Sequence, residues 1–173
     1  MNRIVNGKHN TVTWHVDDLK SSHVDPKIND EFLDWLKRKY ASDDIGEVKV
    51  TRGHRHNYLA MVLDFSRPGV LQLDTTNYVK GMVANFPAKL EGEGAIPWTP
   101  KLFAVDNKSK RLDDERATIF HTFVMKGMFL CKRARQDIQE PGIAFLSTRT
   151  SELSEEDWAK LVKLMVFLKA TQD

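Results

Sequence analysis

Two adjacent carboxylates interrupt a run of alternating, strand-like residues near the start of this chain. The tetrapeptide His15-Val16-Asp17-Asp18 follows Thr11-Val12-Thr13-Trp14 and precedes Leu19-Lys20-Ser21-Ser22. Such flanks predict two strands of an antiparallel hairpin, with the residues between them forming its turn. Asn6-Gly7, a few residues earlier, is a strong hairpin signal of its own. The sequence therefore predicts a small antiparallel meander with the acidic pair at one tip.

The acidic pair has two chemical interpretations. Aspartates in turns commonly bond their own backbone, so Asp17 and Asp18 can simply form a solvated turn. Carboxylates are also the hard oxygen ligands that Mg²⁺ prefers, and polymerases hold Mg²⁺ through one or two carboxylates together with substrate phosphates. The tetrapeptide alone leaves both interpretations open.

A helix is predicted directly after the meander. Asp25 is a favourable N-cap, and Pro26 suits the first helical position. Apolar residues then recur at three- and four-residue spacing up to Ala41, which predicts one apolar stripe. We expect Phe32 and Trp35 of this stripe to pack as core residues against the sheet.

A second hairpin is predicted beyond this helix. Residues 47–51 and 58–65 have the composition of strands, and the polar residues 52–57 separate them. Pro68-Gly69 predicts a tight turn into a further strand over residues 70–74.

The remaining part of the chain is predicted to be mainly helical. Residues 77–85 form an amphipathic pattern that Pro87 ends, and residues 88–112 are rich in glycine, proline and charge and predict a loop. Further helices are expected from Asp113 to the basic residues at 132–135, over residues 143–150, and after the capping box Ser154-Glu155-Glu156-Asp157.

Composition limits the class of protein. The chain has 173 residues, 41% of them hydrophobic and 29% charged, as in ordinary globular proteins. No apolar run approaches the roughly 20 residues of a membrane span, and the N-terminus lacks the apolar stretch that is typical of a signal peptide. The single cysteine, Cys131, is expected in the core and fits a reducing compartment. We expect an intracellular protein, with cytoplasm, virus-like particle and nucleus not distinguished.

Several motifs of the chain share one order and spacing with a known family. They are the acidic tetrapeptide, Tyr58-Leu59-Ala60-Met61, Ser66-Arg67-Pro68-Gly69, Leu71-Gln72-Leu73-Asp74, Asn77-Tyr78-Val79-Lys80, Lys132-Arg133-Ala134-Arg135-Gln136-Asp137-Ile138, Trp158 and Leu168-Lys169-Ala170-Thr171-Gln172-Asp173. In this arrangement the chain resembles the reverse transcriptase of copia-type LTR retrotransposons. The resemblance covers nearly the whole chain.

The resemblance implies a partial RNA-directed DNA polymerase from a retrotransposon polyprotein. Its fold class would be α+β, with a small antiparallel palm sheet of two hairpins and packed helices, followed by a helical thumb and connection lobe. Residues 1–74 would be the partial palm with the catalytic hairpin and primer grip. Residues 75–111 would be the thumb helix and a loop linker, and residues 112–173 the helical connection segment.

The resemblance also implies roles for particular residues. Asp17 and Asp18 would be catalytic and would bind the cofactor Mg²⁺, in a hairpin completed by His15 and Val16. The primer grip would be Tyr58, Leu59, Ala60 and Met61, and Lys80 would contact nucleic acid. The implied partners are an RNA template with a DNA primer, or an RNA–DNA hybrid, the incoming dNTP and the rest of the polyprotein, with no membrane.

The same resemblance implies an incomplete enzyme. In the family a third carboxylate lies on an upstream strand, and both that strand and the fingers would precede Met1. Asp64 and Asp74, on the later hairpin, are not expected to reach the metals. The chain also departs from the family pattern at His15 (usually Tyr or Phe), Ala60 (Gly), Gln136 (Pro) and Ala170 (Gly). Decay and subfamily variation both explain these departures, and we do not expect the chain to polymerise DNA by itself.

Two other functions remain open at this point. One is a non-catalytic nucleic-acid-binding or scaffold remnant, and the other is an inert remnant that only folds. A net charge of +2 does not by itself argue for nucleic acid. The sequence has no zinc-ligand spacing and no Walker-type phosphate loop, and nothing marks a nucleophile.

Overall fold

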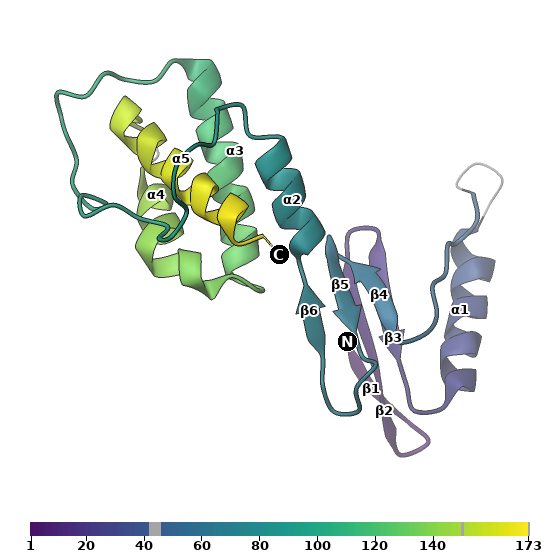
Figure 1. Cartoon of the computed structure of the whole chain (residues 1–173). Coiled ribbons are helices and arrows are strands. Elements are labelled where there is room, and N and C mark those ends of the chain that lie inside the picture. Colours follow the sequence, from purple (N-terminus) through teal and green to yellow (C-terminus); the bar gives the residue numbers. More distant parts are fainter. Residues whose placement is uncertain (42–45, 150, 173) are drawn as a thin grey trace. The chain divides into compact units, whose positions relative to one another are not determined.

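The computed structural model describes residues 1–41, 46–149 and 151–172, shown in Figure 1. In these ranges the protein is α+β, with two antiparallel three-stranded sheets and five α-helices. The chain divides into two compact units. The first unit comprises Met1–Leu59 and Leu63–Val70, and the second comprises Ala60–Val62 and Leu71–Asp173. The predicted division into palm, thumb and connection segments stays a prediction.

The first sheet is the predicted meander. Its strands are β1 (Asn2–Val5), β2 (Lys8–His15) and β3 (Asp18–Ser22), in the order β1-β2-β3. Asn6 and Gly7 both have positive φ, 50° and 72°, as the two central residues of a type I′ turn must. The predicted hairpin at Asn6-Gly7 and the acidic pair at a tip of the meander are thus confirmed.

The helix after the meander is α1 (Pro26–Tyr40), and its predicted start is confirmed. The Asp25 carboxylate accepts a hydrogen bond from the Lys27 N–H, 3.0 Å away, as an N-cap does. The expected core packing of Trp35 is wrong, because α1 has no fully buried residue and the Trp35 side chain is 46% exposed. Trp35 stacks instead on the half-buried Phe32, with ring centroids 5.9 Å apart.

The second sheet differs from the predicted strand boundaries. Its strands are β4 (Arg55–Tyr58), β5 (Met61–Asp64) and β6 (Gln72–Asp74), in the order β4-β5-β6. The strand predicted over residues 47–51 is wrong, because these residues belong to no strand, and β4 begins inside the expected linker.

The motif Tyr58-Leu59-Ala60-Met61 is a turn and not a continuous strand. Leu59 and Ala60 have positive φ, 50° and 57°, and join β4 to β5 as a two-residue loop. The second predicted turn is confirmed, because the Val70 N–H donates to the Arg67 carbonyl at 3.0 Å. Gly69 has the positive φ of 74° that a type II turn requires.

The second unit contains the other helices. They are α2 (Thr76–Ala84), α3 (Asp114–Cys131), α4 (Ala144–Thr148) and α5 (Glu155–Ala170), with a 3₁₀ turn at Gln136–Ile138 and a π turn at Gln139–Ile143 before α4. The predicted helix after Asp113 is confirmed, as is the capping box of Ser154 and Asp157 that opens α5. The α4 helix is shorter than predicted, and Thr150 lies outside the described residues.

The main hydrophobic core lies within the second unit. Its largest fully buried side chains come from α3, α4, α5 and the turns between them, and include Phe120, Leu130, Ile138, Leu161 and Leu168. Cys131 is fully buried in this core, as expected, and burial raises the pKa of its thiol. None of the described helices is both long and apolar enough to cross a membrane.

The long loop between α2 and α3 lies along α5. Three lysines of α5 donate hydrogen bonds to carbonyls of this loop: Lys160 to Ala104 at 2.5 Å, and Lys163 to Glu93 and Lys169 to Leu90 at 3.0 Å each. Gly94 approaches α5 so closely that an added Cβ would lie 2.7 Å from the Val166 carbonyl oxygen. The loop is therefore an integral part of the second unit.

Candidate functional site

The hairpin that carries the acidic pair has a strained turn. His15 pairs with Asp18, which leaves Val16 and Asp17 as a two-residue loop. Val16 has φ of 51°, a left-handed conformation that is unusual for a β-branched residue. The indole Nε1–H of Trp14 donates to the Val16 carbonyl at 2.6 Å and so restrains this turn. Strained residues of this kind concentrate at functional sites.

A hydrogen bond joins the acidic hairpin to the loop between β4 and β5. The Leu59 backbone N–H donates to Oδ2 of Asp18 at 3.2 Å, across 41 residues of sequence. The left-handed conformation of Leu59 belongs to the two-residue loop that presents this N–H. The structure thus brings together Asp18 and Leu59, which belong to two separate predicted sites.

Tyr58, next to this contact, has an unusual hydroxyl. Its oxygen is buried and has no hydrogen-bond partner among the described residues. A buried polar atom without a partner is costly, and such atoms are rare in folded proteins. Tyr58 also lines the same groove as Asp17 and Asp18.

The two carboxylates have the donor chemistry of a magnesium site. Asp17 is exposed, and Asp18 is half-buried with one oxygen engaged by Leu59. Each carboxylate oxygen has two lone pairs, so the contact with Leu59 leaves Asp18 able to ligate a cation. The part of the chain that the structure describes holds no group of three acidic, histidine or cysteine side chains that could bind a metal. Asp17 and Asp18 thus match Mg²⁺ in the kind of ligand atom, and by themselves would supply at most two side-chain ligands.

The aspartates of the later hairpin have local partners. Hydrogen bonds from Ser66, followed by the nearby charge of Arg55, hold the pKa of Asp64 below its ordinary value. The Asp74 carboxylate accepts a hydrogen bond from the Thr76 N–H at 2.8 Å.

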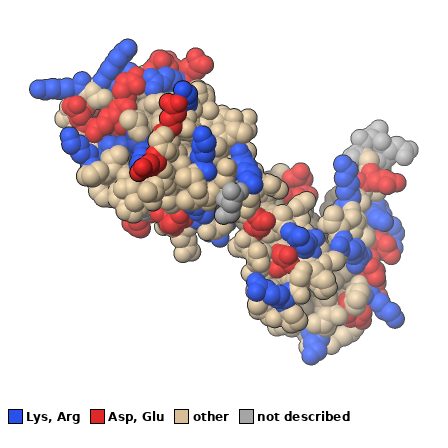
Figure 2. Space-filling view, in the orientation of Figure 1, with Lys and Arg blue, Asp and Glu red and all other residues tan. Residues whose placement is uncertain are grey.

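The remaining predicted site residues differ in exposure. His15 is exposed beside the acidic turn, and Lys80 is exposed on α2 in the second unit. Met61 begins β5 and is 8% exposed, so its side chain is largely buried. On the face shown in Figure 2, basic and acidic side chains are interspersed and form no continuous basic track among the described residues.

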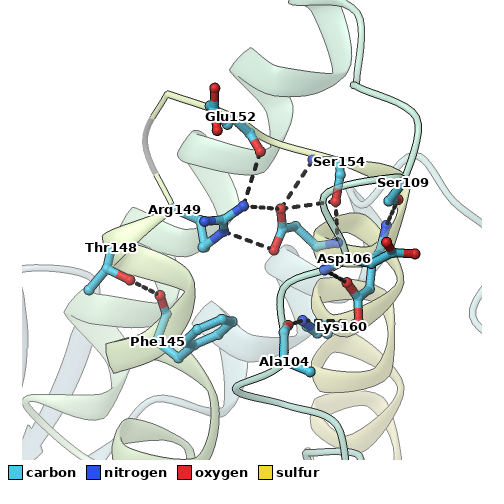
Figure 3. Close-up of polar contacts among 11 residues, drawn as sticks. Ala104, Asp106, Ser109, Phe145, Thr148, Arg149, Glu152, Ser154 and Lys160 are labelled. Atoms are coloured by element: carbon cyan, nitrogen blue, oxygen red, sulfur yellow. Dashed lines mark hydrogen bonds and ion pairs between the residues drawn. The ribbon is translucent and has the colours of Figure 1, made fainter.

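A buried polar cluster lies in the second unit, shown in Figure 3. Asp157 is 1% exposed, and its carboxylate pairs with Arg149 at 3.2 Å and accepts the Ser154 N–H at 3.1 Å. Lys160, 5% exposed, contacts the Ala104 carbonyl and Glu156. These charged groups pair with one another or form hydrogen bonds to backbone groups of the α5 N-terminus and the α2–α3 loop. The cluster therefore connects α4, α5 and that loop.

Sequence reasoning identifies the acidic hairpin but misses its contact with Leu59. Leu59-Ala60 carries no glycine, asparagine or aspartate, so no turn signal marks the loop that supplies the N–H. Trp14, next to the turn, is the one local signal for the restraint on Val16. No protein-family model, no curated protein and no solved structure matches this chain.

Proposed function

We propose that this chain is part of a copia-type reverse transcriptase, an RNA-directed DNA polymerase of a retrotransposon polyprotein. In this proposal residues 1–74 are a partial palm with the catalytic hairpin and primer grip. Residues 75–111 are then the thumb helix and a loop linker, and residues 112–173 the helical connection segment. The order and spacing of the motifs support the proposal, and so does the α+β architecture.

One observation carries the proposal beyond the motifs. The hydrogen bond from Leu59 to Asp18 connects the two hairpins that the resemblance assigns to metal binding and to the primer end. A polymerase needs these two elements side by side, because the attacking 3′-hydroxyl must meet the metal-bound phosphate.

The residues would have distinct roles. Asp17 and Asp18 would hold Mg²⁺, which clamps the attacking and leaving oxygens of phosphoryl transfer when bound. The β4–β5 loop would position the primer end, and Leu59 would orient Asp18. A third carboxylate and the fingers would come from another segment of polypeptide, so the chain alone is expected to lack polymerase activity.

The decisive experiment restores the lacking parts. The chain is fused behind the fingers and upstream palm of a copia-type reverse transcriptase, and dNTP incorporation is measured on a primed RNA template. Asp17→Asn is expected to abolish incorporation, while the matched control Asp34→Asn, an exposed carboxylate on α1, leaves it unchanged. Full activity of the Asp17→Asn fusion would refute the assignment of the hairpin.

A measurement on the chain itself complements the fusion. Titration calorimetry with Mg²⁺ compares the unmodified chain with the double variant Asp17→Asn/Asp18→Asn. Binding that is lost only in the double variant supports the hairpin as the metal site. Equal binding by both proteins would place the metal elsewhere.

A non-catalytic remnant that binds nucleic acid or acts as a scaffold is the second candidate. One observation favours it: among the described residues, no third acidic, histidine or cysteine side chain joins Asp17 and Asp18 in a group that could hold a metal ion. This function predicts steeply salt-dependent binding to an RNA–DNA hybrid without nucleotide incorporation in the fusion. Absence of hybrid binding even at low salt would instead indicate an inert remnant.

A further inference from the structure

A large groove lies within the first unit. It has a volume of about 1060 Å³ and begins at Asp17 and Asp18. Most of its lining comes from three uninterrupted runs, residues 17–23, 46–53 and 56–58. The rest comes mainly from one side of α1.

The uninterrupted runs show how the groove is oriented. Successive residues of an extended chain point to opposite faces, so a groove over one face contacts only every second residue. Every residue of 17–23 and of 46–53 lines this groove. Along β3 the groove therefore includes the edge of the strand, where N–H and C=O groups project, and is not confined to one face of the sheet.

One of these edges belongs to β3, the last strand of the first sheet. The turn at Val16 and Asp17 directs the Asp18 N–H toward His15. Because backbone groups alternate along a strand, the N–H and C=O groups of Lys20 and Ser22 also point to β2. Leu19 and Ser21 then direct their N–H and C=O groups to the outer edge. No strand of the described residues pairs with that edge.

The opposite side of the groove is formed by residues 46–53. Residues 47–53 belong to neither a helix nor a strand. They lead into β4, which is the first strand of the order β4-β5-β6 and so has an open edge of its own. Residues of two outer strands, β3 and β4, therefore line the groove.

The side chains that α1 contributes are apolar and incompletely covered. Phe32, Leu33 and Leu36 line the groove and are half-buried, and no residue of α1 is fully buried. Covering them would remove further apolar surface from water, which is favourable in proportion to the area covered.

From these three features we propose that the groove receives one extended polypeptide strand. The strand would bond to the open edge of β3 through backbone groups, as in β-augmentation. Its alternate side chains would be apolar and would pack on Phe32, Leu33 and Leu36, and the others would be polar. A second copy of the chain fits poorly, because its edge strands are attached to whole sheets while this groove is also bordered by α1 and by residues 46–53. The proposal stands independently of the proposed function.

The first test uses a labelled synthetic peptide of alternating valine and lysine as the probe. Fluorescence anisotropy is expected to show saturable binding to the intact chain. The control peptide is N-methylated at every second residue, so that it keeps its side chains but loses the N–H donors of one edge. Its affinity is expected to fall by about tenfold or more, which is about 1.4 kcal/mol. Equal binding of both peptides, or no binding of either, would overturn the proposal.

Amide hydrogen exchange locates the bound peptide. The outward amides of Leu19 and Ser21 are expected to gain protection in the complex, while the amide of Lys20, already paired with β2, changes little. Protection of Leu19 and Ser21 in a dimer without peptide would overturn the proposal in favour of a second copy.

A matched pair of variants tests the edge itself. Both Ser21→Pro and Ser21→Ala remove the hydroxyl that donates to Asn29 at 2.8 Å, but only proline removes the outward N–H. Peptide binding is expected to persist in Ser21→Ala and to be lost in Ser21→Pro. Binding retained by a folded Ser21→Pro protein would contradict pairing at β3.

Discussion

Ala60 occupies a backbone conformation that ordinarily selects glycine. Its φ is 57°, and the preceding Leu59 has φ of 50°, so both central positions of the β4–β5 loop are left-handed. For an L-residue with a Cβ this conformation costs about 1–2 kcal/mol. The resemblance to the family leads us to expect glycine at position 60 for close backbone approach, whereas the structure gives a conformational reason.

Replacing Ala60 by glycine should therefore stabilise the protein. We expect Ala60→Gly to raise the free energy of unfolding by about 1 kcal/mol, measured by urea denaturation. The control is Ala159→Gly on an exposed position of α5, where glycine should cost about 0.5–1 kcal/mol. Destabilisation by both variants would show that the loop is not left-handed in solution.

Tyr78 gives the protein an alkaline dependence of stability. Burial raises the pKa of its phenol above the ordinary 10.0, against the opposing charge of Arg133. The folded state thus favours the neutral phenol more than the unfolded state does. This contribution is complete below about pH 10 and decreases as the pH rises through the folded pKa.

Removing the phenol hydroxyl tests this sign. Stability of Tyr78→Phe should fall less between roughly pH 9 and pH 11 than that of the unmodified chain, measured by urea denaturation at each pH. Tyr40→Phe, at a side chain 49% exposed, is the matched control and should follow the unmodified chain. A control that flattened the profile as much as Tyr78→Phe would refute the assignment.

At the scale of elements, the loop between α2 and α3 depends on its close approach to α5. A Cβ at Gly94 would lie 2.4 Å from the Ala170 Cβ and 2.7 Å from the Val166 carbonyl oxygen, so the loop must move away from the helix. Gly94→Ala should cost about 1–3 kcal/mol, measured by thermal or urea unfolding.

Gly81 on α2 provides a control substitution whose expected effect on stability has the opposite sign. A Cβ there meets nothing within 4 Å. Because alanine is the better helix former, Gly81→Ala should stabilise by about 0.5–1 kcal/mol. Equal effects of the two substitutions would show that the loop does not pack on α5 as described.

The elements also show how much of the fold the sequence can predict. The turns at Asn6-Gly7 and Pro68-Gly69, the Asp25 cap and the Ser154 capping box are encoded by neighbouring residues, and all four predictions are confirmed. The ends of β4 are not predicted, because Leu59-Ala60 contains no residue that favours a left-handed turn. The ordered loop rests on lysine–carbonyl contacts across 56 to 79 residues, which no local pattern reveals.

The candidate site, like the fold, can be predicted from the sequence only in part. Asp17 and Asp18 can be placed at a hairpin tip, because alternation on both sides defines the strands. The contact of Asp18 with Leu59 cannot be predicted, since it depends on how two hairpins meet. The open edge of β3 depends likewise on the strand order of the sheet.

At the scale of the whole molecule, burial is unevenly distributed between the two units. The main cluster of buried apolar side chains runs from Val79 to Leu168 and lies wholly in the second unit. In the first unit, α1 has no fully buried residue, and Asn10 is the one buried residue of the meander. Local stability follows local burial, so the first unit should open at lower free energy.

Native-state hydrogen exchange can measure this difference. Amides of β1–β3 and α1 should exchange through openings of lower free energy than those of α3 and α5. The amide groups within α3 and α5 serve as the internal reference for global unfolding. A common exchange free energy in both units would show that they unfold together.

The indole of Trp14 has an optical consequence. It is 69% exposed, yet its N–H is committed to the carbonyl of the strained turn residue Val16. A tryptophan N–H usually finds a hydrogen-bond partner within the protein when it is buried, so this bond is unusual for an exposed indole. Any event that reshapes the acidic turn must break or lengthen this bond, so the emission spectrum of Trp14 is a built-in reporter of the hairpin. With Trp35, Trp98 and Trp158 replaced by phenylalanine, the protein would signal occupancy of its acidic tip without an added dye.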